Sequence, residues 1–285
     1  MMMIRQLVIT ALFLACCSPG MRAGEGLSAS GQTQAEIEDI GLIEPVGEDE
    51  MAGRFRASVT VNNTFTTNAE LSGYNDSSDY LFLPIVQVGY KKPLTSQITF
   101  DIAAKLELAL YAKYDQRAFI GYSILTTLDW RPRPKLPRFY VGIEPYRYDS
   151  INSGGLLTSA VGFSAGTDWG YAFNQGSSLA FIGYTFTDYL ADPSSDSRTQ
   201  NKVVLGITHQ FRPQLFGQLI YAWQYSDFIN ADRHDFQNLI GLNLTYQINA
   251  NLFTTLSGSW VSNDSDANKA SYESTGGSLG FTLSF

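Results

Sequence analysis

Two histidines are the first place to look for chemistry in this chain, because an imidazole beside a serine can form a hydrolytic centre. On a β-strand, a serine two residues after the histidine would point to the same side and could act as the nucleophile. His209 is followed by glutamine and phenylalanine, and His234 by aspartate and phenylalanine, so neither has that serine. The sequence therefore predicts no catalytic residue at either position.

Metal and thiol chemistry have equally little support. The only cysteines, Cys16 and Cys17, lie in an apolar run near the N-terminus. Three segments gather carboxylates that could bind calcium, but none has the spacing of a 12-residue calcium loop, and solvated turn residues explain them better. These segments are Asn75 to Asp79, Asp192 to Asp196 and Asn263 to Asp266. We therefore expect no metal site and no cofactor.

The first 23 residues have the pattern of a secretory signal peptide. Arg5 precedes an apolar run from Leu7 to Cys17 that is shorter than the roughly 20 residues of a spanning helix, and Ala23 offers a cleavage point. A lipoprotein anchored at Cys16 is the alternative. Either way the chain is exported, and cleavage after Ala23 would leave a mature protein without cysteine.

Residues 24–53 are acidic, with eight Asp and Glu residues and no Lys or Arg. We expect a flexible periplasmic segment here, with a plug or a docking segment for a periplasmic partner as alternatives. The whole chain has 27 acidic and 19 basic residues and lacks a basic stripe. This excludes a nucleic-acid partner, which requires a concentrated positive surface.

From residue 54 onward the sequence alternates apolar and polar residues with period two, which predicts an all-β domain over residues 54–285. Turn residues divide this region into twelve expected strands. Their ranges are 54–66, 80–91, 96–113, 117–131, 138–148, 158–173, 178–190, 199–212, 215–228, 235–248, 251–263 and 272–285.

The strand expected at 96–113 shows the two faces most clearly. Even positions from Ile98 to Leu110 are apolar, whereas the odd positions include Asp101, Lys105 and Glu107. Twelve tilted strands about 4.8 Å apart would enclose a cylinder roughly 24 Å across, too wide for side chains to fill with a dry core. We therefore expect a closed antiparallel transmembrane β-barrel with its apolar face toward lipid. A soluble β-sandwich is the alternative.

Charged residues at the alternate strand positions that form the polar face would line the lumen. They are Arg56, Lys91, Asp101, Lys105, Glu107, Asp129, Glu144, Asp168, Lys202 and Arg212. Because these residues include both signs of charge, they could set a transverse electric field in a pore. Alternatively, the side chains could pair with one another across strands and fill a closed barrel. We predict that any constriction of the lumen lies where five of these residues are expected to come close together, namely Asp101, Lys105, Glu107, Asp129 and Glu144.

The connections alternate in length. Short turns follow every second strand, at 91–96, 173–178, 212–215 and 248–251, whereas longer polar loops lie at 67–79, 149–157 and 191–198. In bacterial barrels the short turns face the periplasm, which predicts periplasmic N- and C-termini. The proline-rich basic turn 131–138 is an exception that either fixes a rigid spacing or contacts a periplasmic partner.

Aromatic residues gather near the expected strand ends, as in the interfacial belts of membrane proteins. With the orientation above, one group lies at the periplasmic rim and comprises Trp130, Trp169, Tyr171 and Tyr246. The other lies at the outer rim and comprises Tyr111, Trp223, Tyr225 and Trp260.

The last strand, from Gly277 to the terminal Phe285, resembles the terminal signature of bacterial outer-membrane proteins. The region from Arg233 to Phe285 is similar to β-barrel porin families of uncharacterised function. The resemblance implies a cell outer membrane location in contact with lipid and lipopolysaccharide, and recognition by the barrel-assembly machinery. The residues that would carry this assembly signal are Leu279, Phe281, Leu283 and Phe285.

We therefore expect an outer-membrane porin or export channel that passes small or extended solutes, including ions, through a polar lumen. A non-conducting structural or adhesive barrel is the alternative. A surface hydrolase is the third hypothesis, because Asp232-Arg233-His234 with Asp264-Ser265-Asp266 resembles the paired motifs of outer-membrane barrel proteases. Those proteases look like ten-stranded barrels, so we expect no enzyme activity.

Overall fold

The computed structural model describes residues 54–69, 71, 77–133, 136–267 and 270–285. The predicted signal peptide and the acidic segment 24–53 lie outside the described residues. Twelve strands make up most of the described chain. They are β1 (Arg54–Thr66), β2 (Asp79–Pro93), β3 (Ile98–Tyr111), β4 (Phe119–Trp130), β5 (Arg138–Ser150), β6 (Leu156–Phe173), β7 (Ser178–Asp192), β8 (Arg198–Arg212), β9 (Leu215–Phe228), β10 (Arg233–Gln247), β11 (Leu252–Ser265) and β12 (Tyr272–Ser284).

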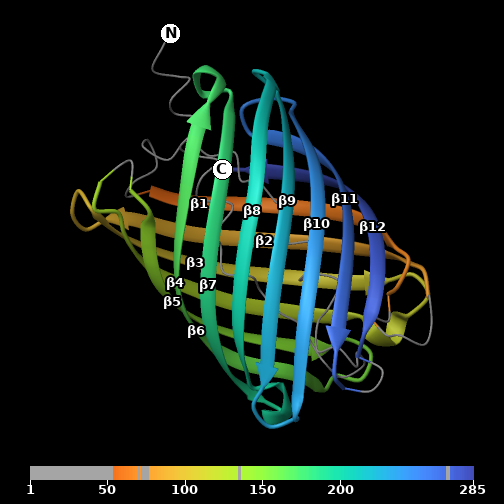
Figure 1. Cartoon of the computed structure of the whole chain (residues 1–285). Helices are drawn as coiled ribbons and strands as arrows, with labels where there is room; N and C mark the ends of the chain where they lie inside the picture. The colour runs from red at the N-terminus through yellow and green to blue at the C-terminus, as the bar shows by residue number, and fades with distance from the viewer. Residues whose placement is uncertain (1–53, 70, 72–76, 134–135, 268–269) are drawn as a thin grey trace.

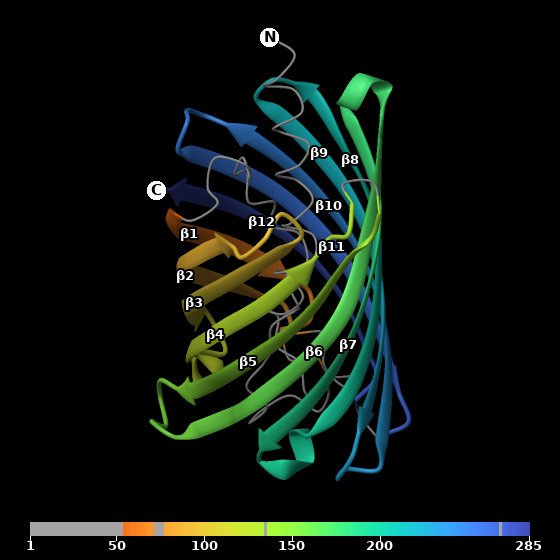
Figure 2. The same cartoon turned by 90° about the vertical axis from the view of Figure 1, so that its left-hand side faces the viewer.

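The strands form one closed antiparallel barrel in which each strand pairs with its neighbours in the chain (Figure 1). The barrel closes where β1 pairs with β12, from Ser58 opposite Ser284 to Thr66 opposite Gly276. Figure 2 shows these two strands side by side. Phe285 extends the seam, because its backbone N–H donates to the carbonyl of Ala57 at 2.8 Å. The predicted fold class, strand number and closing pair are confirmed.

All twelve strands begin and end within two residues of the predicted bounds, and β1 and β9 match them at both ends. Among the described residues the helical elements are three short 3-10 turns, η2 (Asp115–Arg117), η3 (Asn174–Gly176) and η4 (Ser194–Asp196). No helix in the described ranges is long and apolar enough to cross a membrane.

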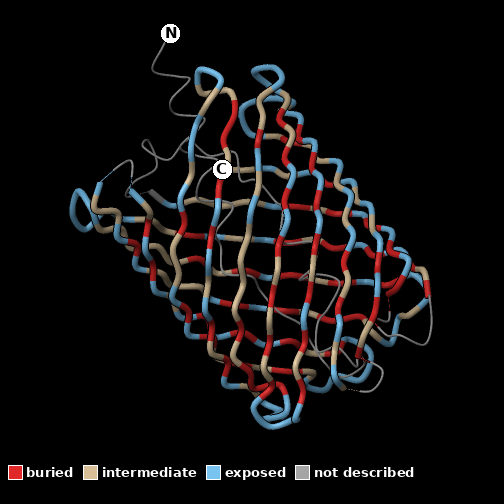
Figure 3. Tube along the Cα trace, viewed as in Figure 1, coloured by how far each residue is buried: buried red, intermediate tan, exposed pale blue. Residues whose placement is uncertain are grey.

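Burial alternates along every strand, so buried and exposed residues follow one another across the wall (Figure 3). On β3 the odd residues Lys105 and Glu107 are buried inside the barrel, whereas Leu106 and Leu110 are exposed on its outer surface. The polar face therefore faces inward and the apolar face outward. A soluble sandwich would require the reverse arrangement.

The outward apolar band has the height of a bilayer core. On β10 the outward residues from Phe236 to Tyr246 are exposed aromatic and aliphatic side chains interrupted by Asn238. Ten residues at about 3.3 Å each, tilted by about 40°, span roughly 25 Å along the barrel axis. The amide of Asn238 accepts a hydrogen bond from Tyr221 Oη at 2.7 Å, which lowers the cost of an outward polar group.

The two ends of the barrel differ. We call the end with Arg54 and Phe285 the terminal rim and the opposite end the distal rim. The terminal rim has the connections 94–97, 131–137, 174–177, 213–214 and 248–251, and the distal rim has 67–78, 112–118, 151–155, 193–197, 229–232 and 266–271. The predicted difference in length is present, although 131–137 is long and 229–232 is short.

The aromatic belts are present with one correction. Trp130, Trp169, Tyr171 and Tyr246 are exposed near the terminal rim, as predicted. Trp223, Tyr225 and Trp260 have outward positions in the distal half. The prediction for Tyr111 was wrong, because it follows the inward parity of β3 and is buried in the lumen beside Leu81 and Phe119.

Candidate functional site

The barrel lumen is the candidate site. Nine of the ten predicted charged residues have inward positions, namely Arg56, Lys91, Asp101, Lys105, Glu107, Asp129, Glu144, Asp168 and Lys202. Arg212 is the exception. A register shift between Gln210 and Arg212 places it opposite Leu215, at an exposed position beside the turn. The prediction for Arg212 was wrong because the bulge reverses the parity of the strand.

Two ion-pair groups lie in the terminal half of the lumen. Arg56 makes two hydrogen bonds to Asp101, at 2.8 and 2.9 Å. Arg138 connects two carboxylates, with Nε 2.7 Å from Asp168 Oδ2 and Nη1 3.5 Å from Asp129 Oδ1. All three residues of the second group are less than 9% exposed, so burial makes the charge of each carboxylate costly and the guanidinium offsets part of that cost.

The middle of the lumen contains a third pair. Lys105 Nζ lies 3.0 Å from Glu107 Oε2, and both side chains come from β3. The predicted constriction would have gathered these two residues with Asp101, Asp129 and Glu144. The structure pairs Asp101 with Arg56 and Asp129 with Arg138 in the terminal half. The predicted constriction stays a prediction.

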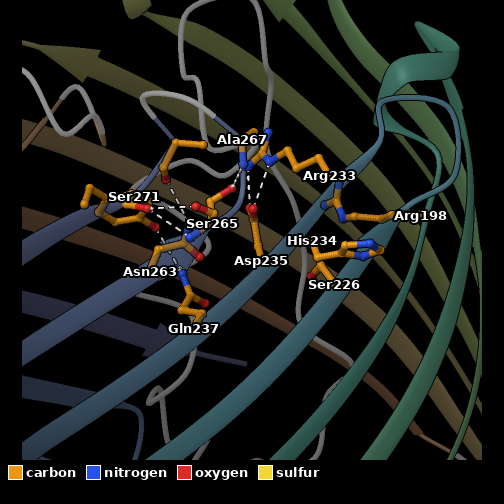
Figure 4. A network of polar contacts seen from close by, with 12 residues as sticks. Arg198, Ser226, Arg233, His234, Asp235, Gln237, Asn263, Ser265, Ala267 and Ser271 are labelled. Carbon is orange, nitrogen blue, oxygen red and sulfur yellow. Dashed lines mark hydrogen bonds and ion pairs between the residues drawn. The ribbon is translucent and has the colours of Figure 1, made fainter.

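In the distal half, a row of arginine and aromatic side chains runs along the inner wall from strand to strand. Cross-strand pairing places Tyr189, Arg198, Phe228 and Arg233 in register on β7 to β10. The guanidinium of Arg198 lies 5.3 Å from the ring centres of Tyr189 and Phe228, and that of Arg233 lies 4.3 Å from Phe228. Arg233 also forms a bidentate ion pair with Asp235 (Figure 4). These contacts hold both guanidinium groups against the wall.

The sequence prediction missed Arg138, Arg198 and Arg233 as lumen residues. Arg138 was counted both in the basic turn 131–138 and as the first residue of its strand, and the other two preceded the expected starts of their strands. Extending the parity of Lys202 back by four residues would have identified Arg198, because inward positions repeat every two residues.

The connection after β1 reaches into the distal end of the lumen. Ala69 packs with inward residues of β2 to β7, whereas Leu71 packs with Ala222, Leu239 and other inward residues of β9 to β12. Both are 1% exposed. Asn68 Nδ2 donates to the carbonyl of Glu273, and Arg117 Nη1 donates to the carbonyl of Ala69. Through Ala69 and Leu71, this connection therefore contacts both the β2–β7 side and the β9–β12 side of the barrel at its distal end.

Inward aromatic rings lie over glycines on neighbouring strands. Tyr189 is opposite Gly162 in the register of β6 and β7, and a Cβ on Gly162 would lie 2.4 Å from the ring. The same arrangement joins Tyr148 to Gly121, Tyr140 to Gly166 and Phe181 to Gly206. Each glycine leaves space for a ring along the wall, so the ring does not project toward the barrel axis.

The inward side chains of β9, β11 and β12 are uncharged. Amide side chains form a chain of hydrogen bonds here, from Asn243 to Gln218 at 3.3 Å and from Gln218 to Thr208 at 3.4 Å. On β11 and β12 the inward Ser257 and Ser278 keep part of their surface exposed. A solute on this side would meet hydroxyl and amide groups.

Comparison with known proteins agrees with this geometry. Residues 155–285 match the sequence family described as "Putative beta-barrel porin 2". The chain is a closed twelve-stranded β-barrel whose C-terminal part resembles this porin family. No curated protein shows significant similarity to it.

Two solved structures share the fold of this barrel. The COG4313 outer membrane channel from Pseudomonas putida F1 has a TM-score of 0.54 at 13% identity, covering 82% of this chain and 96% of that one. The β domain of the Bordetella autotransporter BrkA has a TM-score of 0.50 at 11% identity, covering 82% and 100%. At these identities the similarity is one of fold.

The barrel does not assemble the protease-like arrangement around His234. Its Nδ1 lies 3.1 Å from Asp227 Oδ1 and 3.2 Å from Tyr225 Oη, on the outward face. Asp266 accepts the backbone N–H of His234. Asp264 lies opposite Phe236 in the register of β10 and β11. The imidazole therefore pairs with a carboxylate outside both motifs.

A serine–histidine pair that the sequence analysis missed lies at the terminal rim. Ser178 Oγ is 2.9 Å from His209 Nδ1 and accepts a hydrogen bond from Asn174 Nδ2 at 3.0 Å. The residues are 31 positions apart, so spacing along one strand could not have identified them. Within the described residues no carboxylate contacts His209, and the ring packs edge-on against Phe211. The arrangement resembles the capping of a turn more than an activated nucleophile.

Two of the acidic segments, Asp192 to Asp196 and Asn263 to Asp266, are described in full, whereas part of the third, Asn75 to Asp79, lies outside the described residues. No group of three or more His, Cys, Asp or Glu side chains in the described part of the chain could hold a metal ion. Asp79 instead accepts backbone N–H groups from Lys113 and Tyr114, which fastens the start of β2 to the next distal connection.

Proposed function

We propose that this protein is an outer-membrane channel for small or extended polar solutes. The observation that carries the proposal is the inverted wall, with Leu, Ile, Val and Phe facing outward and charged, amide and hydroxyl groups facing inward. A twelve-stranded barrel of roughly 24 Å backbone diameter is wide enough for a polar lumen.

The terminal rim faces the periplasm in this proposal. Support comes from the shorter turns at that rim and from the exposed carboxylates at the distal rim. The inward charges are largely paired within the wall, so we expect only a weak preference for cations or anions. The side chains have no catalytic part in the proposed function.

A solute-uptake assay tests the proposal. Purified full-length protein is refolded into vesicles, and swelling is measured in isosmotic solutions of a small polyol and of a disaccharide. We expect swelling with both solutes, and faster swelling with the smaller one. Vesicles that swell no faster than protein-free vesicles with either solute would contradict the channel.

A non-conducting barrel is the second candidate, and the connection after β1 favours it. Ala69 and Leu71 join the two sides of the lumen at its distal end, which would narrow a passage there. Replacing Leu71 with glycine removes its packing against Ala222 and Leu239. If the natural chain is impermeable and L71G is permeable, the connection closes the barrel.

A further inference from the structure

The inner wall of the barrel is not covered evenly. On β5 to β10 most inward side chains are buried, among them Glu144, Gln218 and Leu239. Inward residues of β11 and β12 keep part of their surface exposed over a longer stretch, namely Thr255, Ser257, Ser259, Ser278, Thr282 and Ser284. Open surface in the lumen therefore lies mainly beside the seam that closes the barrel.

These hydroxyl groups form a strip that begins at the terminal rim. Cross-strand pairing places Ser58 of β1 opposite Ser284, and Ser257 opposite Ser278 in the middle of β12. Toward the distal rim the strip ends, because the inward Val261 of β11 is only 1% exposed. A solute that enters from the terminal rim would thus meet hydroxyl groups as far as the middle of the barrel.

One ion pair lies beside the terminal end of this hydroxyl strip. Arg56 is on β1, two residues before Ser58, and its guanidinium reaches across β2 to Asp101 on β3. Gly89 of β2 leaves the space for it, because a Cβ on that glycine would lie 2.9 Å from Arg56 Nε. The backbone of β2 therefore allows the pair to lie along the wall at the mouth of the strip.

This pair differs in exposure from the other ion pairs of the lumen described above. The side chains of Arg56 and Asp101 are 24% and 18% exposed. In the ion pairs of Lys105, Arg138 and Arg233, no side chain is more than 10% exposed. Of these pairs, ions that enter the lumen would come closest to the one between Arg56 and Asp101.

We propose that solutes pass along the hydroxyl strip, and that the Arg56–Asp101 pair determines the ion selectivity of this path. The proposal rests on the channel function proposed above. Opposite charges 2.8 Å apart largely cancel at the distance of a passing ion, so removing one charge exposes the field of the other. The inward Lys91 and Lys202 are also partly exposed, and they stay unchanged in every variant below.

Cysteine labelling tests the path without requiring conduction. Ser278→Cys and Ser226→Cys place a thiol at two inward positions, the first in the strip and the second on β9, where the serine is 2% exposed. The background is the full-length chain with Cys16 and Cys17 replaced by serine. In refolded protein, a charged thiol reagent should modify Ser278→Cys about ten-fold faster than Ser226→Cys. Equal rates, or faster modification of Ser226→Cys, would overturn the path.

Reversal potentials in a potassium chloride gradient test the role of the pair. Asp101→Asn should shift the permeability ratio about two-fold toward chloride, and Arg56→Gln about two-fold toward potassium. The double variant should return to the natural ratio. Asp149→Asn is the matched control, because it removes the same charge from a side chain that is 20% exposed but lies on the outer surface. This control should leave the ratio unchanged.

The outcomes distinguish this inference from the channel proposal. Conducting channels whose ratio is the same in both single variants, or moves in the same direction in both, would overturn the role of the pair and leave the channel intact. A natural protein that shows no conductance would overturn the channel and the role of the pair together. The labelling rates would then still show whether the strip is open to the terminal rim.

Discussion

Arg138 lies between two buried carboxylates, Asp129 and Asp168, on the inner wall of the barrel. Arg138→Ala would leave both carboxylates without this guanidinium, and we expect it to lower the free energy of unfolding by about 3 kcal/mol. Chemical unfolding of the refolded protein in vesicles, followed by tryptophan fluorescence, measures this change.

Arg147 provides the control for that substitution. It also bonds to an aspartate, Asp149, but its side chain is half exposed on the outer surface. Solvent screens such a pair, so Arg147→Ala should give no measurable loss. Equal losses for the two variants would show that burial does not determine the contribution of the lumen pair.

Glycines of the wall give a second comparison between matched positions. Gly162→Ala would place a Cβ 2.4 Å from the Tyr189 ring, whereas a Cβ on Gly258 would meet no atom within 4 Å. We expect Gly162→Ala to destabilise the barrel by about 1–3 kcal/mol, because the ring must leave its place along the wall. Gly258→Ala should be neutral or slightly stabilising, since alanine restricts the unfolded chain. Unfolding curves that shift equally for both variants would rule out the ring-over-glycine packing.

Most inward charges of the terminal half and the middle of the lumen could be predicted from parity alone, because a strand alternates strictly between its two faces. Parity failed at Arg212, where the bulge near Gln210 shifts the register. It also could not show which charges pair. Arg138 joins Asp129 and Asp168 from three strands, and that selection depends on cross-strand register, which the sequence of one strand does not contain.

At the level of elements, the seam between β12 and β1 closes the barrel. The outward residues Leu279, Phe281, Leu283 and Phe285 are 38–64% exposed, so they add little to packing within the chain. As an assembly signal they would act before the barrel closes. We expect Phe285→Ala to reduce the amount of barrel inserted in cells while the purified variant still refolds in detergent. Heat-modifiable migration on gels measures both quantities, and a variant that fails to refold in detergent would assign Phe285 a structural role.

The strands themselves were predictable because their signals are local. Alternation and turn residues determine where each begins and ends, and the observed bounds differ from the predicted ones by at most two residues. The inward course of Ala69 and Leu71 was not predictable. These residues follow a strand in a polar connection, and their burial depends on two apolar clusters whose other buried residues come from ten strands of the barrel.

At the scale of the whole molecule, the orientation in the membrane can be tested with two matched serines. Ser96 lies in an exposed connection of the terminal rim and Ser153 in one of the distal rim. A membrane-impermeant thiol reagent applied to intact cells should label Ser153→Cys and should label Ser96→Cys only after the outer membrane is permeabilised. The reverse pattern would mean that the terminal rim faces outward.

The wall of this barrel places apolar side chains outward and polar side chains toward a lumen that no dry core could fill. Conduction is the central claim that follows. Single-channel recording of the refolded full-length protein in a planar bilayer tests it most directly. We predict discrete conductance steps with a reversal potential close to zero in a salt gradient, since the lumen charges are largely paired. A bilayer that shows no steps above the protein-free baseline, with correctly refolded protein inserted, would contradict the account.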